Sequence, residues 1–224
     1  MARVSKEGEG PSDPEMSGAP PPRFQHYFTA RPRAPHATRS LRFLYKGRVL
    51  TFTTDRGLFS YEQVDPGTSL LIENMDLEGV ERMLDLGCGW GAVGVAAAVG
   101  IPRGHVVMVD VNHRAVLLAR ENLRANHLEN AEVRQGDLYH PVGEERFDLI
   151  VSNPPFKAGR DLVLRLMSEA PRHLRPGGRL LLVGKGSQGV LYYQRWLEER
   201  WTKVEVLGRG GGYRVLQASG FPPP

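Results

Sequence analysis

The sequence lacks the features of a secreted, membrane-spanning or cysteine-stabilised protein. Its 224 residues include one cysteine, Cys88, which excludes an intramolecular disulfide framework and a zinc site of clustered cysteines. The seven histidines show no metal-ligand spacing. No apolar run approaches the roughly 18 residues that cross a bilayer, and the first twenty residues contain no apolar signal core. We therefore expect a soluble, cytoplasmic protein that binds neither a metal nor a membrane.

Hydrophobic residues make up 41% of the chain, which is enough for one domain with a full-sized core. Residues 1–22, rich in Gly, Pro and Ser, are predicted to be a disordered tail. Residues 23–66 are predicted to be an extension with a β-hairpin, because Lys46-Gly47 stands between alternating apolar positions. The main domain is expected over residues 67–224, beginning with a short helix that Thr68 or Ser69 caps.

From residue 82 onward, short apolar runs alternate with helical segments. This alternation predicts an α/β fold, a doubly wound and mostly parallel sheet with helices on both faces. The last two strands have no room for a crossover helix between them, so the final strand is expected to be antiparallel. The seven predicted strands cover residues 82–87, 105–111, 131–137, 146–153, 178–184, 203–208 and 213–219.

The formal net charge of +4 is unevenly distributed. Residues 1–50 contain nine Lys and Arg but four Asp and Glu, whereas the other 174 residues contain 20 and 21. No acid occurs between Arg23 and Arg48. Such a basic segment favours a polyanionic partner, because cations that neutralise phosphates release counterions; a solvated linker is the alternative. The candidate contacts are Arg31, Arg33, Arg39 and Arg42.

A glycine-rich loop, LDLGCGWGA at residues 84–92, lies where a strand passes into a helix. Gly87 and Gly89 permit a tight turn and a close approach of the backbone to a ligand. The spacing also fits a loose dinucleotide fingerprint, so a nicotinamide cofactor stays open. Asp85 favours a ligand with an ammonium group over a pyrophosphate. Cys88 is expected to face the ligand as a small residue.

Two further acids follow the next two strands. Asp110, with Val111 beside it, is positioned to accept hydrogen bonds from both hydroxyls of a ribose. Asp137, with Leu138 beside it, is within reach of the exocyclic amine of an adenine. Together with Asp85 and the glycines, these acids predict a nucleoside site at the carboxyl edge of the sheet.

The stretch Asn153-Pro154-Pro155-Phe156 follows the fourth predicted strand. The prolines stiffen the loop and remove backbone donors, which leaves carbonyl oxygens as acceptors. With the side-chain carbonyl of Asn153, they can accept both hydrogens of a planar NH2 group. Phe156 offers a ring on which a base can stack. Lys157, the next residue, is a candidate phosphate contact, and a rigid turn without a ligand is the alternative interpretation.

These stretches, with VDVN, GDLY and HLRPGGRLLLV, occur in the order seen in class I S-adenosylmethionine-dependent methyltransferases, which the chain resembles over residues 40–219. SNPPF and the upstream GLFSYEQVDPGTSLLIE are similar to the small-domain group related to bacterial ribosomal RNA guanine-N2 methyltransferases, especially its short, single-domain members. The resemblance implies a Rossmann-like fold and S-adenosylmethionine as cofactor. It implies that Asp85, Gly87 and Gly89 bind the methionine moiety, Asp110 the ribose and Asp137 the adenine.

The same resemblance implies that residues 153–156 hold the target amine and that Phe59 and Ser60 cover the cofactor. The expected partner is ribosomal RNA or a ribosomal subunit, and a monomer is expected. Three alternatives stay open: methylation of adenine N6 or of a protein glutamine amide, a nicotinamide-dependent oxidoreductase, and a non-catalytic RNA-binding module.

Overall fold

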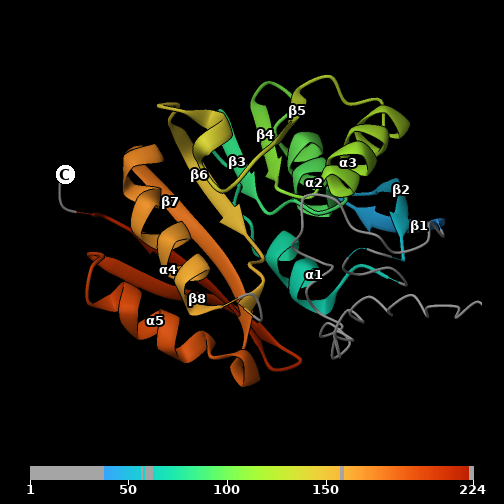
Figure 1. Ribbon diagram of the computed structural model, residues 1–224. Helices are drawn as coiled ribbons and strands as arrows, with labels where there is room; N and C mark the ends of the chain where they lie inside the picture. Colours follow the sequence, from blue (N-terminus) through green and yellow to red (C-terminus); the bar gives the residue numbers. More distant parts are fainter. Residues whose placement is uncertain (1–37, 57, 59–62, 157–158, 222–224) are drawn as a thin grey trace, which may run out of the picture.

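The computed structural model, which describes residues 38–56, 58, 63–156 and 159–221, contains a central seven-stranded sheet in the order β5-β4-β3-β6-β7-β9-β8 (Figure 1). These strands are β3 (Arg82–Leu86), β4 (His105–Asp110), β5 (Ala131–Gln135), β6 (Phe147–Ser152), β7 (Leu174–Lys185), β8 (Lys203–Gly210) and β9 (Tyr213–Ser219). Across the sheet, the strand numbers fall from β5 to β3 and rise again from β6, so the strand order reverses between β3 and β6, as in a doubly wound fold. This confirms the predicted α/β fold class.

The sheet is parallel except at β9, which runs antiparallel to both β7 and β8. Only Gly211 and Gly212 separate β8 from β9, and both have positive φ, +56° and +82°. A two-residue connection of this kind reverses the chain at once, which allows only antiparallel neighbours. The predicted antiparallel last strand is therefore confirmed.

Helices cover both faces of the sheet and enclose two apolar cores (Figure 1). On one face lie α1 (Pro66–Glu73), α2 (Ala92–Gly100) and α3 (His113–Ala125). On the other lie α4 (Arg160–Glu169) and α5 (Val190–Glu198), with the short 3-10 turns η1 (His140–Val142), η3 (Ala170–His173) and η4 (Gly186–Gln188) along the connections. Successive residues of each strand point into opposite cores, as for Met83 and Leu84 of β3.

The predicted hairpin is present as a separate two-stranded sheet, β1 (Thr38–Tyr45) and β2 (Arg48–Asp55). Its two turn residues, Lys46 and Gly47, both have positive φ, +47° and +76°, as a type I′ turn requires. Leu50 and Phe52 are fully buried against the helices of the first face. The hairpin thus contributes to the same core as α1, α2 and α3.

Two asparagines, Asn122 of α3 and Asn126 directly after it, hold the outer edge of β2. The side chain of Asn122 accepts a hydrogen bond from Thr53 N at 2.7 Å and donates to Thr53 O at 3.0 Å. One turn later, Asn126 does the same for Thr51, at 3.0 and 2.7 Å. Each amide therefore occupies the place of a neighbouring strand along this edge.

The start of α1 differs from the prediction. Asp65, and neither Thr68 nor Ser69, is the N-cap: its Oδ2 accepts a hydrogen bond from Thr68 N at 3.0 Å. Pro66 then occupies the first helical position, where a missing N–H costs nothing. The Asp-Pro pair is the stronger capping signal, and the prediction passed over it.

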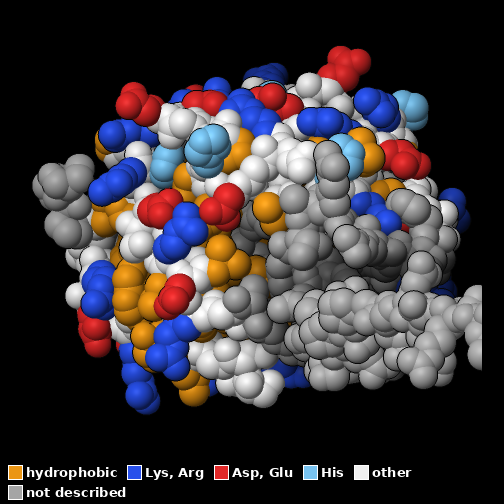
Figure 2. Space-filling view, viewed as in Figure 1, with side chains coloured by type: hydrophobic (Ala, Val, Ile, Leu, Met, Phe, Trp, Pro, Cys, Tyr) orange, Lys and Arg blue, Asp and Glu red, His pale blue; other side chains and the backbone are white. Residues whose placement is uncertain are grey.

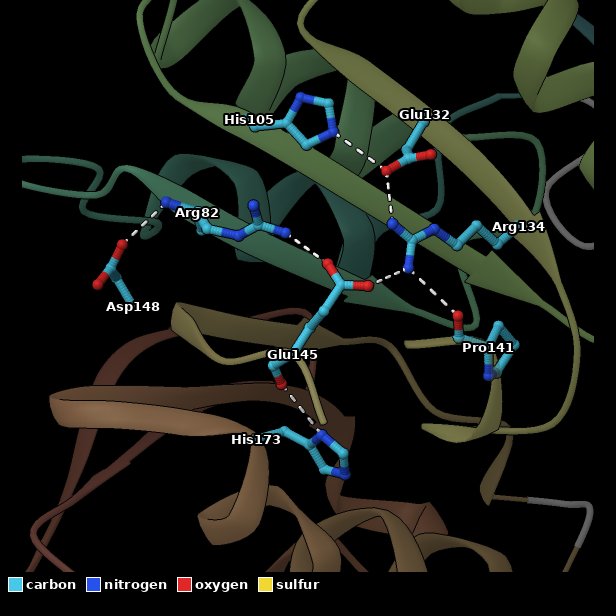
Figure 3. A network of polar contacts seen from close by, with 8 residues as sticks. All are labelled: Arg82, His105, Glu132, Arg134, Pro141, Glu145, Asp148 and His173. Carbon is cyan, nitrogen blue, oxygen red and sulfur yellow. Dashed lines mark hydrogen bonds and ion pairs between the residues drawn. The ribbon is translucent and has the colours of Figure 1, made fainter. Parts of the chain in front are cut away.

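A polar network ties the amino ends of β3, β4 and β6 to neighbouring segments (Figure 3). Glu145 pairs with Arg82 at 2.5 Å and also with Arg134, which in turn pairs with Glu132 at 2.7 Å. Asp148 accepts from the backbone N–H of Arg82 at 2.8 Å. These charges pair with one another and link the segments at the amino edge of the sheet. The candidate site lies at the opposite, carboxyl edge.

Candidate active site

The glycine-rich loop turns sharply between β3 and α2. Gly87 and Gly89 adopt the left-handed region, with φ of +72° and +56°, and a Cβ placed on either would meet no atom within 4 Å. The backbone N–H groups of Gly87 and Cys88 donate to the carbonyl of Val109 at 2.8 and 3.0 Å, which fixes the loop to the end of β4. The loop therefore leaves open space above two glycines at the carboxyl edge.

Two acids, the buried Asp85 and the partly buried Asp110, lie beneath this loop. Asp85 is 2% exposed, and its Oδ2 accepts a hydrogen bond from Gly94 N at 2.9 Å. Asp110 accepts from Gly89 N and from Asn112 N, both at 2.8 Å. Asn112, rather than Asp110, caps α3, and the ribose contact of Asp110 stays a prediction. Both carboxylates retain lone pairs for further partners.

Burial controls the protonation of these groups. Desolvation raises the pKa of Asp85 to about 7, against a hydrogen bond from Gly94 that lowers it and with a smaller contribution from the charge of Asp110. Burial likewise raises the pKa of Asp110. The pKa of the Cys88 thiol lies well above its usual value, because of burial and then the charges of Asp110 and Asp85. A thiol in that state is a poor nucleophile.

Asp137 lies at the rim of the site. Its side chain is exposed, and its Oδ2 pairs with Arg165 of α4 at 3.3 Å. The next residue, Leu138, has a φ of +44°, so the chain turns abruptly there. The adenine contact stays a prediction, and an adenine at this place competes with Arg165 for the carboxylate. Val111, beside Asp110, is partly buried.

The loop of residues 153–156 lies level with the glycine-rich loop. Asp85 and Val151 are register partners in the parallel pair β3–β6, and Gly87 and Asn153 each follow directly on the last residue of their strand. Both residues therefore lie at the carboxyl edge of the sheet. The hydroxyl of Ser152 donates to Leu86 O at 2.7 Å and joins the two strand ends. The sheet thus brings together two stretches that the sequence predicted separately.

The individual residues of this loop are firmly placed. The carbonyl of Pro154 accepts the N–H of Phe156 at 2.9 Å, so one of its two lone pairs is occupied. The partly buried ring of Phe156 packs against Tyr193, with centroids 5.2 Å apart, and over Gly184, where a Cβ would lie 2.5 Å from it. Pro155, like Asn153, is partly exposed.

Asn153 is anchored by a group that the sequence analysis missed. Its Nδ2 donates to Thr68 Oγ1 at 2.9 Å and to Asp65 Oδ2 at 3.3 Å, both at the start of α1. Asp65 and Asn153 are 88 residues apart, so no local pattern links them. The Asp-Pro capping signal identifies Asp65 as the start of a helix but not its partner.

Of the remaining predicted contact residues, the structure describes only some. Arg39 and Arg42 are exposed on β1. The predictions for Arg31, Arg33, Phe59, Ser60 and Lys157 lie outside the described residues. Among the residues that the structure describes, no group of three or more His, Cys, Asp or Glu is arranged to hold a metal ion, and no helix has the length and apolar character to cross a membrane.

Taken together, the carboxyl edge offers an open glycine-rich turn, the buried carboxyl group of Asp85, the partly buried one of Asp110 and an anchored asparagine amide. A family model, the methyltransferase small domain, matches residues 49–217. The chain belongs to this family. The predictions of the family and of an enzyme that transfers methyl groups are therefore confirmed.

Individual relatives agree with this family. The chain is similar to the uncharacterized protein YbxB of Bacillus subtilis, at 34% identity over 87% of this chain and 98% of that protein. It is also similar to ribosomal RNA small subunit methyltransferase C of Hamiltonella defensa, at 35% identity over 78% of this chain but 52% of the relative.

Among solved structures, a T. thermophilus 16S rRNA N2 methyltransferase (RsmC), in complex with AdoMet and guanosine, has 33% identity and a TM-score of 0.72. The match covers 84% of this chain and 52% of that structure. The chain thus spans about half the length of these named ribosomal RNA methyltransferases and nearly all of YbxB.

Proposed function

We propose that this methyltransferase transfers a methyl group from S-adenosylmethionine to an exocyclic amine of RNA, namely N2 of a guanine in ribosomal RNA. The observation that carries the proposal is that Gly87 and Asn153 directly follow the ends of the adjacent parallel strands β3 and β6. A methyl donor above the glycines and an amine held by the asparagine are then neighbours. The similarity to RsmC, solved with AdoMet and guanosine, supports both halves of the proposal.

The site residues fit this cofactor. Gly87 and Gly89 leave open space where any side chain would stand, and Asp85 lies behind them with an acid group suited to an ammonium. Asp110 ends β4 with a carboxylate suited to ribose hydroxyls, and Asp137 follows β5 where an adenine amine is expected. When bound, S-adenosylmethionine supplies a methyl group activated by its sulfonium sulfur.

The residues of the loop then orient the acceptor. The Asn153 side-chain carbonyl and the free lone pair of the Pro154 carbonyl accept the two amine hydrogens, which directs the nitrogen lone pair away from them. Phe156, held by Tyr193, supports the base. Orientation and exclusion of water supply most of the acceleration. No strong base is needed, because the nitrogen becomes acidic as it is methylated, and its proton then passes to water.

Ribosomal RNA as the substrate rests on the named relatives and on the basic hairpin. The relatives of known name are ribosomal RNA methyltransferases, and exposed Arg39 and Arg42 offer cations to phosphates. A cytoplasmic location and a monomeric state complete the proposal and stay predictions.

The direct test is transfer of a labelled methyl group to RNA. Ribosomal RNA and ribosomal subunits from a strain without this protein are incubated with enzyme and labelled S-adenosylmethionine, and the modified nucleotide is mapped. We expect one N2-methylguanine. Label on adenine or on a ribosomal protein would mean that the acceptor is not guanine N2, while the protein would still be a methyltransferase. Cofactor binding without transfer to any RNA or protein would support a non-catalytic module.

Asn153→Ala isolates the proposed role of the amide. We expect kcat to fall at least about 100-fold, because without the orienting amide the amine is misplaced, while the Kd for S-adenosylmethionine stays within about twofold. The matched control is Asn130→Ala, which removes an amide bonded to Ala98 O and Ile101 O on the amino side of the sheet. Full turnover in Asn153→Ala with intact cofactor binding would sink the proposal.

A further inference from the structure

We propose that Asp65 is a positioning residue: with Thr68, it fixes the side-chain amide of Asn153 so that only the carbonyl faces the substrate. The inference deepens the proposed function and rests on it for the identity of the substrate. It adds residues at the start of α1 to those that determine specificity, besides the glycine-rich loop and residues 153–156.

The contacts account for both hydrogens of the Asn153 NH2 group. One acceptor is Thr68 Oγ1 at 2.9 Å and the other is Asp65 Oδ2 at 3.3 Å. The C=O and C–N bonds of an amide diverge within one plane, so anchoring the nitrogen at α1 directs the oxygen away from the Asp65 and Thr68 acceptors. In this state Asn153 offers the substrate an acceptor and no donor.

Asp65 is itself held in place from other sides. It is 9% exposed, its Oδ2 accepts from Thr68 N at 3.0 Å, and its Oδ1 accepts from the hydroxyl of Tyr213 at 3.2 Å. The Tyr213 ring lies against Gly67, where a Cβ would approach it to 2.6 Å. The position of the Asp65 carboxylate is therefore fixed, and so is the direction from which it accepts the hydrogen bond of the Asn153 amide.

This arrangement discriminates between chemical groups. An asparagine that presents only its carbonyl oxygen pairs with an N–H donor such as an exocyclic amine. It repels a substrate carbonyl, because two oxygens would then face each other. A flipped amide would present its NH2 group and select a carbonyl instead. Carboxylate oxygens accept and never donate when ionised, so Asp65 opposes the flip. The start of α1 thereby selects an amine over the neighbouring carbonyl of a guanine.

The test uses Asp65→Ser, because serine caps a helix about as well as aspartate but is too short to reach Asn153. We expect kcat to fall about 10- to 100-fold with an unchanged Kd for S-adenosylmethionine. In the Asn153→Ala background, Asp65→Ser should lower kcat no further, because Asp65 acts through that amide. Equal losses in both backgrounds would make Asp65 a structural residue only and overturn the proposal.

Asp148→Ser is the matched control for lost stability. Asp148 accepts from the backbone N–H of Glu81 and of Arg82, at 3.0 and 2.8 Å, on the amino side of the sheet. We expect this variant to lose stability and to keep kcat at a temperature where it is folded. If it loses kcat as Asp65→Ser does, the loss reports stability and not orientation.

A second measurement needs no RNA. The side-chain amide signals of Asn153, assigned by their loss in Asn153→Ala, are followed by NMR in the full chain. We expect slow exchange of the two amide hydrogens, and faster exchange with shifted signals in Asp65→Ser. Unchanged signals would overturn the proposal. If the parent enzyme methylates no RNA, the proposed function fails, while these signals still decide the orientation of Asn153.

Discussion

At the scale of single residues, Asp85 combines deep burial with a carboxyl group that has one hydrogen bond from Gly94. Desolvation raises its pKa to about 7, so the folded chain without ligand holds a proton there at mildly acidic pH. An ammonium group placed beside the carboxyl would favour the ionised form and release that proton. The residue is thus suited to a cationic ligand, which would favour its ionised form.

This state predicts a pH dependence of stability. In the unfolded chain Asp85 ionises near pH 4, whereas in the folded chain it stays neutral up to about pH 7. Its stabilising contribution is therefore full below about pH 4 and is lost as pH rises through about 7. Asp85→Asn removes this loss, so the variant without ligand should gain stability over wild type between pH 4.5 and 7.5, by on the order of 2–4 kcal/mol.

The measurement is the free energy of unfolding in urea at several pH values, without S-adenosylmethionine. Asparagine can still accept the Gly94 N–H, so the comparison isolates ionisation. A difference between variant and wild type that does not change with pH would contradict the raised pKa.

At the scale of elements, the contact between α3 and the hairpin predicts a large effect of one amide. Asn122 is fully buried and also donates to Trp90 O at 2.7 Å. Asn122→Ala leaves the backbone groups of Thr53 and the Trp90 carbonyl without this partner, so we expect a loss of about 2–4 kcal/mol in the free energy of unfolding. Hydrogen exchange should show a loss of protection at the Thr53 amide.

Glu121→Ala is the control for this experiment, because Glu121 touches the Thr53 hydroxyl at 3.4 Å from the exposed side. It should change the free energy of unfolding by less than about 0.5 kcal/mol. An equally protected Thr53 amide in Asn122→Ala would mean that β1 alone holds β2 in place.

The elements differ in how far the sequence predicts them. Turn chemistry is local, so Lys46-Gly47 predicted the hairpin. The short connection between the last two strands leaves no room for a crossover helix, which predicted the antiparallel last strand. The contacts of Asn122 and Asn126 with β2 cross about 70 residues of chain, and an asparagine on a helix has no pattern that distinguishes it from a solvated one. The anchor between Asp65 and Asn153 was missed for the same reason.

At the scale of the molecule, charge is distributed unevenly between the hairpin and the domain. Figure 2 shows acidic and basic side chains interspersed over the described part of the face in view. The nearly equal numbers of acidic and basic residues beyond residue 50 predict this mixture. The hairpin lies with one end at the carboxyl edge, because Asp55 pairs with Arg114 at the start of α3 at 3.2 Å. Arg39, opposite Thr54, stands at this end, and Lys46 at the other.

RNA binding should therefore depend on position along the hairpin. Replacing Arg39 and Arg42 with Gln should weaken RNA binding and flatten its salt dependence, by about 0.7–0.9 in log–log slope for each phosphate that the protein no longer neutralises. Adding Arg31 and Arg33 to the variant should extend both effects, and the Kd for S-adenosylmethionine should not change. Binding titrations at about 50 to 200 mM salt measure this.

The matched control replaces Lys46 and Arg103 with Gln, which removes the same charge from exposed positions away from the carboxyl edge. It should reduce RNA affinity less. Equal effects of the two pairs would mean that RNA responds to net charge alone, and Arg39 and Arg42 would then have no specific role in docking RNA.

Asn122 and the C-cap residue Asn126 also fix the register of β2 against α3. Four residues of an α-helix advance about 6 Å and two residues of a strand about 6.7 Å, so side chains at these spacings match. Since neighbouring residues of β2 present their backbone groups to opposite edges, the hairpin can seat on α3 only in steps of two residues. The distance from Arg39 to the carboxyl edge is therefore set in discrete increments.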